Sequence, residues 1–248
     1  MGKSIVITSG KGGVGKSTVT VYLGIALCQS GKRVLLMDMD EGLRSLDLML
    51  DVSSHTVFDV SDILSGRCNA NQAVLPVPHC TNLFLLPAPA QVGAVQNTGM
   101  LARLCRKFAE YFDFVLIDSP AGVGPGFSSA IAAADMALVV VNPDPVSVRD
   151  GSYVAALLKK QQTQEIRLVI NKLNTRMMRN GTFLNIDEII DTTGVQLIAA
   201  IPTDEQIVHA SAAGKPLSPS YAKESFLRLA HRLCGEDIPL PDNLMKIT

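Results

Sequence analysis

The chain has 248 residues, of which 47% are hydrophobic and 18% are charged, and its formal net charge is −1. A chain of this length and apolarity can bury a large core, and such a composition excludes an intrinsically disordered protein. The near-zero net charge provides no overall basic field, so we do not expect the chain to bind nucleic acid.

The cysteines indicate the redox environment. The chain has five, scattered and without any C-x-x-C pair, so neither a disulfide framework nor a zinc or iron–sulfur site is expected. Reduced thiols favour a cytoplasmic location. The first apolar run is too short for a signal peptide, and no stretch reaches the roughly 18 apolar residues of a membrane span.

Short aliphatic runs of strand length recur along the chain, and segments with helical spacing lie between them. Nearly continuous apolar runs are typical of strands covered on both faces. The sequence therefore predicts an α/β fold, with a doubly wound, mostly parallel sheet and helices on both faces. Strands are expected at 4–8, 33–37, 82–86, 114–118, 136–141, 167–171 and 195–201, and helices at 17–30, 99–112, 150–162 and 221–234.

The domain organisation is expected to be simple. No internal repeat, low-complexity tract or linker-like change in composition interrupts the chain. We therefore expect residues 1–248 to form a single domain, with a core at about 3–235 and a C-terminal tail at 236–248.

The segment GKGGVGKS at 10–17 matches the pattern G-x-x-x-x-G-K-S between a predicted strand and a predicted helix. Its glycines allow successive backbone N–H groups to turn inward around phosphates, and the helix adds its positive N-terminal end. Lys16 is expected to neutralise the β- and γ-phosphates and the Ser17 hydroxyl to bind Mg²⁺. The alternative is a glycine-rich turn. The predicted nucleotide-binding residues are Gly10, Lys11, Gly12, Gly13, Val14, Gly15, Lys16, Ser17 and Thr18.

Acidic residues end two of the later predicted strands. Asp118 closes the run FVLID, where a carboxylate can accept a hydrogen bond from Mg²⁺-bound water. Asp38 and Asp40 alternate at the end of another strand, so their side chains start on opposite faces unless the chain turns there. One of the two is placed to position an attacking water. Solvated turn aspartates are the alternative for this pair.

The chain resembles the MinD/ParA family of deviant Walker A ATPases, and within that family the MinD branch. The resemblance extends over nearly the whole chain. The lysine directly after the first loop glycine, Lys11, defines the deviant class. The segments that carry the resemblance are SGKGGVGKST (9–18), MDMDEGLRSLDLML (37–50), IDSPAGVG (117–124), NPDPVSVRD (142–150) and IPTDEQIV (201–208).

The resemblance implies a Mg²⁺-dependent ATPase that converts ATP and water to ADP and phosphate. It implies that Lys11 reaches across a two-fold interface to phosphates held by a second copy, so that ATP becomes part of a homodimer interface. It also implies that Asp40 orients the attacking water. The catalytic residues expected from the resemblance are Lys11, Lys16 and Asp40.

The resemblance further implies a metal site and a base site. Ser17, Asp38 and Asp118 would hold Mg²⁺, the two aspartates through water. Asn171 would recognise adenine, and Pro202 would pack near the base. Arg149 and Asp150 match a family segment near the dimer face, although a solvated helix start explains them nearly as well.

The resemblance implies partners as well: an ATP-dependent homodimer, a MinE-like activator and a MinC-like effector, in the placement of the cell-division site. Alternatives are a ParA-like partitioning ATPase, a flagellar-placement regulator, and an iron–sulfur carrier of the same fold, although the carrier's C-x-x-C is absent. Glu41 replaces an expected aliphatic residue, which leaves the regulatory partner open.

The C-terminal segments bear on membrane association. The apolar stripe at 223–235 is expected to pack in the core. The acidic segment after it contains Pro239 and Pro241 and is unsuited to a basic amphipathic helix. Peripheral association with the inner face of the cell membrane would therefore need an anchor beyond this chain.

Overall fold

A computed structural model describes residues 1–95 and 97–241, and within them one eight-stranded sheet. The strand order is β3-β4-β2-β5-β1-β6-β7-β8. All neighbours pair in parallel except β3 and β4, which are antiparallel. The strands are β1 (Lys3–Thr8), β2 (Val34–Asp38), β3 (Leu75–Pro76), β4 (Leu83–Leu86), β5 (Phe114–Asp118), β6 (Met136–Val141), β7 (Glu165–Leu173) and β8 (Leu197–Pro202).

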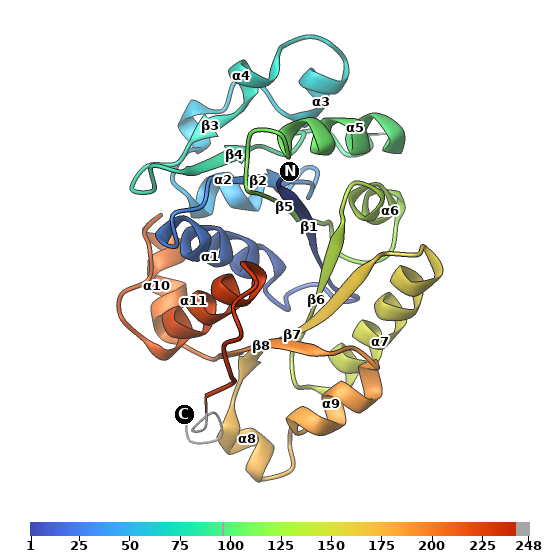
Figure 1. The fold of residues 1–248 in the computed structure, drawn as a ribbon, viewed down its shortest axis with the longest axis vertical. Coiled ribbons are helices and arrows are strands. Elements are labelled where there is room, and N and C mark those ends of the chain that lie inside the picture. The colour runs from blue at the N-terminus through green and yellow to red at the C-terminus, as the bar shows by residue number, and fades with distance from the viewer. Residues whose placement is uncertain (96, 242–248) are drawn as a thin grey trace.

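Helices cover both faces of this sheet, which confirms the predicted doubly wound architecture (Figure 1). One face carries α1, α2, α10 and α11, and the other carries α3 to α9. The helices are α1 (Lys16–Gln29), α2 (Ser45–Met49), α3 (Val60–Leu64), α4 (Ala70–Ala73), α5 (Thr98–Phe108), α6 (Pro125–Ala132), α7 (Pro145–Lys160), α8 (Thr175–Arg179), α9 (Ile186–Thr193), α10 (Glu205–Ala212) and α11 (Tyr221–Leu233), with a 3₁₀ turn at Ser53–His55.

The strands divide their side chains between two cores. On β1, Val6 packs into the core under α5, α6 and α7, whereas Ile5 and Ile7 pack into the core under α1 and α11. All three are fully buried. Alternation within an apolar strand fills both cores, as expected for a strand covered on both faces.

Two helix boundaries differ from the sequence-based expectation. The helix expected at 150–162 begins at Pro145, because the Asp144 side chain accepts a hydrogen bond from the N–H of Ser147 and the proline occupies the first turn. The helix expected at 99–112 ends at Phe108, and 109–111 form a turn before β5.

The helix α11 packs in the core, as predicted for 223–235. Phe226 and Leu229 lie buried against β8 and α1. Within 1–95 and 97–241, no helix is long and apolar enough to cross a bilayer. The expected tail at 236–248 falls mostly outside the described residues.

Candidate active site

The carboxyl ends of β1, β2 and β5 meet at one edge of the sheet, where ligands bind in open α/β folds. The loop 9–15 follows β1, and Asp38 and Asp118 end β2 and β5. In the strand register Asp118 lies opposite both Ile7 and Asp38. The predicted loop and two of the predicted carboxylates are therefore brought together.

The loop has the backbone of a phosphate cradle. Gly13 and Gly15 have φ of 76° and 97°, the left-handed region that favours glycine. A Cβ at Gly15 would lie 2.4 Å from the Asn171 amide nitrogen, whereas one at Gly12 would meet nothing within 4 Å. The helix α1 begins at Lys16, so its N-terminal end faces the loop, and the glycine-rich turn has the geometry of an anion site.

A β-bulge in β7 fixes the shape of this loop. The pairing with β8 shifts register between Ile170 and Leu173, and Lys172 has φ of 53°. In a regular strand neighbouring side chains point to opposite faces, but the bulge re-aims two of them toward the same loop. Asn171 donates to the Val14 carbonyl at 2.8 Å, and Lys172 donates to the Gly13 carbonyl at 2.7 Å.

This contact gives Asn171 a second role beside the predicted recognition of adenine. We expect Asn171→Leu to weaken ATP and GTP binding alike, by about tenfold, because a lost buried hydrogen bond leaves the Val14 carbonyl unpaired. Titration of both nucleotides measures this, with Asn180→Leu, at an exposed position, as the control. A loss confined to ATP would instead assign Asn171 to the base.

Asp38 organises the turn that carries Asp40. Its two carboxylate oxygens accept hydrogen bonds from the backbone N–H of Asp40 at 2.9 Å and of Leu46 at 3.1 Å. Burial raises the pKa of Asp38 to about 6, although these two N–H donors oppose the rise. The chain therefore turns directly after β2, and Asp38 supports the position of Asp40. Its place near a metal stays a prediction.

Asp40 is half-buried beside Lys16. Burial raises the pKa of Asp40, and the charge of Lys16 opposes the rise. Because Lys16 is the phosphate lysine of the loop and is itself only 7% exposed, a bound phosphate and Asp40 would share one small region. This position fits the predicted role in orienting water.

Asp118 is fully buried behind the loop. Thr20 Oγ1 donates to Oδ1 at 3.3 Å, and the Ser17 hydroxyl lies close enough to the carboxylate to lower its pKa. Burial raises the pKa of Asp118 to about 7, Asp38 adds to the rise, and Ser17 and Lys16 oppose it. Its Oδ2 has no hydrogen-bond partner within the described ranges.

That orphaned oxygen tests whether the residues fit Mg²⁺. A buried acceptor without a partner is costly, and the Ser17 hydroxyl that the loop motif assigns to the metal lies close enough to this carboxylate to lower its pKa. An acceptor for Mg²⁺-bound water is the group that this position requires. Ser17 and Asp118 therefore fit a bound Mg²⁺.

The raised pKa of Asp118 has a consequence for stability. A carboxyl whose folded pKa exceeds its ordinary value stabilises the fold at low pH, and this stability is lost as pH rises through about 7. At pH 8 we expect Asp118→Asn to stabilise the nucleotide-free protein, by at most about 4 kcal/mol, since one pKa unit is worth about 1.4 kcal/mol.

The same variant should lose the stabilisation that Mg²⁺ and ATP together provide, because an amide cannot replace a carboxylate as acceptor. Thermal unfolding at pH 5 and pH 8, with and without Mg²⁺ and ATP, measures both effects. Asp191→Asn, on the exposed face of α9, is the control. Nucleotide-free stability unchanged at pH 8 would contradict this account.

Lys11 contacts an acidic residue at the start of a later helix. Its Nζ lies 3.5 Å from Asp144 Oδ1 at the start of α7, and its side chain is 43% exposed. Exposed ion pairs contribute at most about 1 kcal/mol. The ion pair with Asp144 is therefore weak enough for Lys11 to leave it.

The structure also locates the remaining predicted residues. Thr18 is half-buried in the first turn of α1, and Gly10 packs against α7, where a Cβ would lie 2.4 Å from the Asp150 carbonyl oxygen. Pro202 ends β8 beside Leu173 of β7, at the same edge of the sheet. Its contact with a base stays a prediction.

Four residues with contacts at the candidate site escaped the sequence analysis or were assigned no role there. Thr20, one helical turn after Lys16, had a readable signal in its spacing. Lys172, Asp144 and Glu41 had no such signal in the sequence, because the contacts that place them at the site are long-range. Glu41 bonds through its carboxylate to the backbone N–H groups of Gly93 and Val95. It thereby ties the turn that holds Asp40 to the loop before α5.

A phosphate-binding loop between β1 and α1, with a strand-end aspartate behind its serine, defines a P-loop nucleoside triphosphatase. A profile of the ParA family, described as NUBPL iron-transfer P-loop NTPase, matches residues 1–235. The chain belongs to the ParA family of P-loop NTPases, within which its relatives below are MinD proteins.

The septum site-determining protein MinD of Bacillus subtilis is 36% identical over 246 residues, which is 97% of this chain and 92% of the relative. MinD of Synechocystis is 37% identical over 247 residues, 98% of this chain and 93% of the relative.

Among solved structures, the MinC:MinD cell division complex of Aquifex aeolicus has a TM-score of 0.89 and 36% identity, covering 96% of this chain and 98% of the other. MinD of Pyrococcus horikoshii with Mg-ADP has a TM-score of 0.84 and 29% identity, covering 94% and 96%.

Proposed function

We propose that this protein is an ATP-hydrolysing switch that dimerises when it binds ATP and helps to place the cell-division site. The observation that carries the proposal is a complete phosphate loop that contains a second lysine in addition to the phosphate-binding Lys16. Lys16 is 7% exposed, whereas the side chain of Lys11 is 43% exposed and contacts Asp144. A lysine that its own pocket does not use is available to a second copy.

In the proposed mechanism, the loop N–H groups and Lys16 bind the phosphates, and the bulge of β7 keeps the loop in shape. Asp40 orients the attacking water. Mg²⁺, held by Ser17 and by Asp118 through water, would neutralise charge that develops on the phosphates. Lys11 of each chain would complete the partner's pocket, so that loss of the γ-phosphate loosens the pair.

Partners are proposed from the named relatives. The Aquifex complex is one of MinC with MinD, which supports a MinC-like effector for this chain. We also propose a MinE-like activator and peripheral contact with the inner face of the cell membrane. The iron-transfer activity in the family description is not proposed, because the sequence has no C-x-x-C pair.

The experiment is chromatography with light scattering in Mg²⁺ and a non-hydrolysable ATP analogue, with ADP as the matched control. We expect dimers with the analogue and monomers with ADP. Single chains in both would reject the switch. Deletion of the gene should in addition misplace septa, and normally placed septa would reject the cellular role alone.

A further inference from the structure

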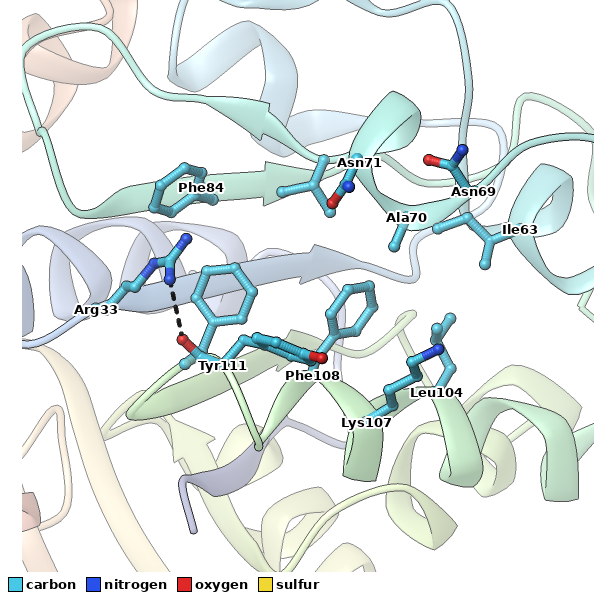
Figure 2. Close-up of a pocket in the computed structure, with 12 residues that line it drawn as sticks. Arg33, Ile63, Asn69, Ala70, Asn71, Phe84, Leu104, Lys107, Phe108 and Tyr111 are labelled. Atoms are coloured by element: carbon cyan, nitrogen blue, oxygen red, sulfur yellow. Dashed lines mark hydrogen bonds between the residues drawn. The ribbon is translucent and has the colours of Figure 1, made fainter.

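A cavity of about 620 Å³ lies at the edge of the sheet opposite the nucleotide loop. Its lining includes Arg33, directly before β2, and Phe112, just before β5, so it opens at the amino ends of these parallel strands. The helices α3 and α4 form one wall and the end of α5 forms the other (Figure 2). This volume is within the range of small-molecule sites.

One wall of the cavity is aromatic. The ring centroids of Phe84 and Phe112 are 5.4 Å apart, and those of Phe108 and Phe112 are 6.1 Å apart, in both cases edge to face. Phe108 and Phe112 are fixed in the core beneath. Such a wall suits the flat, apolar body of a ligand.

The polar groups of the cavity carry one sign of charge. Its twelve lining residues include two cations, Arg33 and Lys107, and no carboxylate. The Arg33 guanidinium lies 5.1 Å and 4.9 Å from the ring centroids of Phe84 and Phe112 and donates to the Tyr111 carbonyl, so it is already engaged. Lys107 forms no ion pair within 1–95 and 97–241.

The remaining polar groups lie opposite the lysine. Figure 2 shows the side-chain amides of Asn69 and Asn71 on the α4 side of the cavity and the Lys107 ammonium on the α5 side. Amide N–H groups can donate hydrogen bonds to an anion, as an ammonium does. An anionic head would therefore meet donors on both walls.

We propose that this cavity binds an amphipathic organic anion, with its flat apolar body against the phenylalanine rings and its carboxylate or sulfonate head at Lys107. An inorganic anion would make no contact with the phenylalanine rings, and a neutral hydrocarbon would make no ionic contact with Lys107. The cavity shares no lining residue with the nucleotide loop.

Two probes with one ring system test the proposal on the full chain: 2-naphthoate and 2-naphthylmethylammonium, titrated by ligand-observed NMR. We expect the anion to bind at least about tenfold more tightly, because charge-assisted hydrogen bonds favour it. Lys107→Glu should reverse this order. Arg103→Glu, an equal charge change at an exposed position of α5 outside the cavity, should leave it unchanged.

Ala70→Trp fills the cavity and should abolish binding of both probes. Unchanged ATP affinity shows that each variant is folded. Equal binding of the two probes to the native protein would overturn the proposal, and this comparison needs no variant. Naphthoate binding that survives both Lys107→Glu and Ala70→Trp would show that the anion does not bind in this cavity.

Discussion

Lys11→Ala should remain monomeric in Mg²⁺ and a non-hydrolysable ATP analogue under conditions in which the native chain dimerises. A two-fold interface loses both lysines at once, and each charge-assisted contact is worth about 1.5 to 3 kcal/mol, so the dimer should weaken by more than about a hundredfold. Activator-stimulated turnover should fall by a similar factor, because a cation supplied in trans stabilises the transferring phosphoryl group.

Binding of ATP to the single chain should survive this change, since Lys16 and the loop remain. Lys160→Ala, an exposed lysine at the end of α7, is the matched control. Light scattering and fluorescent-nucleotide titration separate the two effects. Normal ATP-dependent dimerisation of Lys11→Ala would refute the role of this lysine in the partner's pocket.

A substitution at the contact between Lys11 and Asp144 should strengthen dimerisation instead of weakening it. Asp144→Asn removes the charge that holds Lys11 at its own rim but keeps a good N-cap for α7. Because an exposed pair contributes at most about 1 kcal/mol and each chain of the dimer releases one, dimerisation should strengthen by no more than about thirtyfold.

Asp40→Ala should bind ATP and dimerise but hydrolyse ATP about 10² to 10⁴ times more slowly. The carboxylate lies beside Lys16, and its backbone is held by Asp38, so the variant removes an acceptor for water without opening the loop. Phosphate release at saturating ATP measures turnover. Asp191→Ala should behave as the native chain, and turnover of Asp40→Ala at the native rate would remove Asp40 from the mechanism.

The strands and the phosphate loop were predictable because their signals are local. Continuous aliphatic runs marked seven of the strands, and the spacing of glycines around Lys16 marked the loop. The strand β3 was missed because it has only two residues, one of which is Pro76, so its pairing depends on β4 and not on its own sequence.

The arrangement around the loop was less predictable, because it depends on residues far apart in the chain. Asn171 and Lys172 are adjacent in a strand, and alternation places one of them away from the loop. Only the register shift against β8 directs both toward it. The contact of Lys11 with Asp144 likewise spans most of the chain and leaves no periodic signal.

The bulge of β7 has a consequence for nucleotide exchange. Because Asn171 and Lys172 already engage the carbonyls of Val14 and Gly13, the loop is pre-shaped, and binding of a nucleotide should order little additional backbone. In the proposed mechanism, replacement of ADP by ATP then requires no refolding of the loop, and the γ-phosphate alone distinguishes the two bound forms.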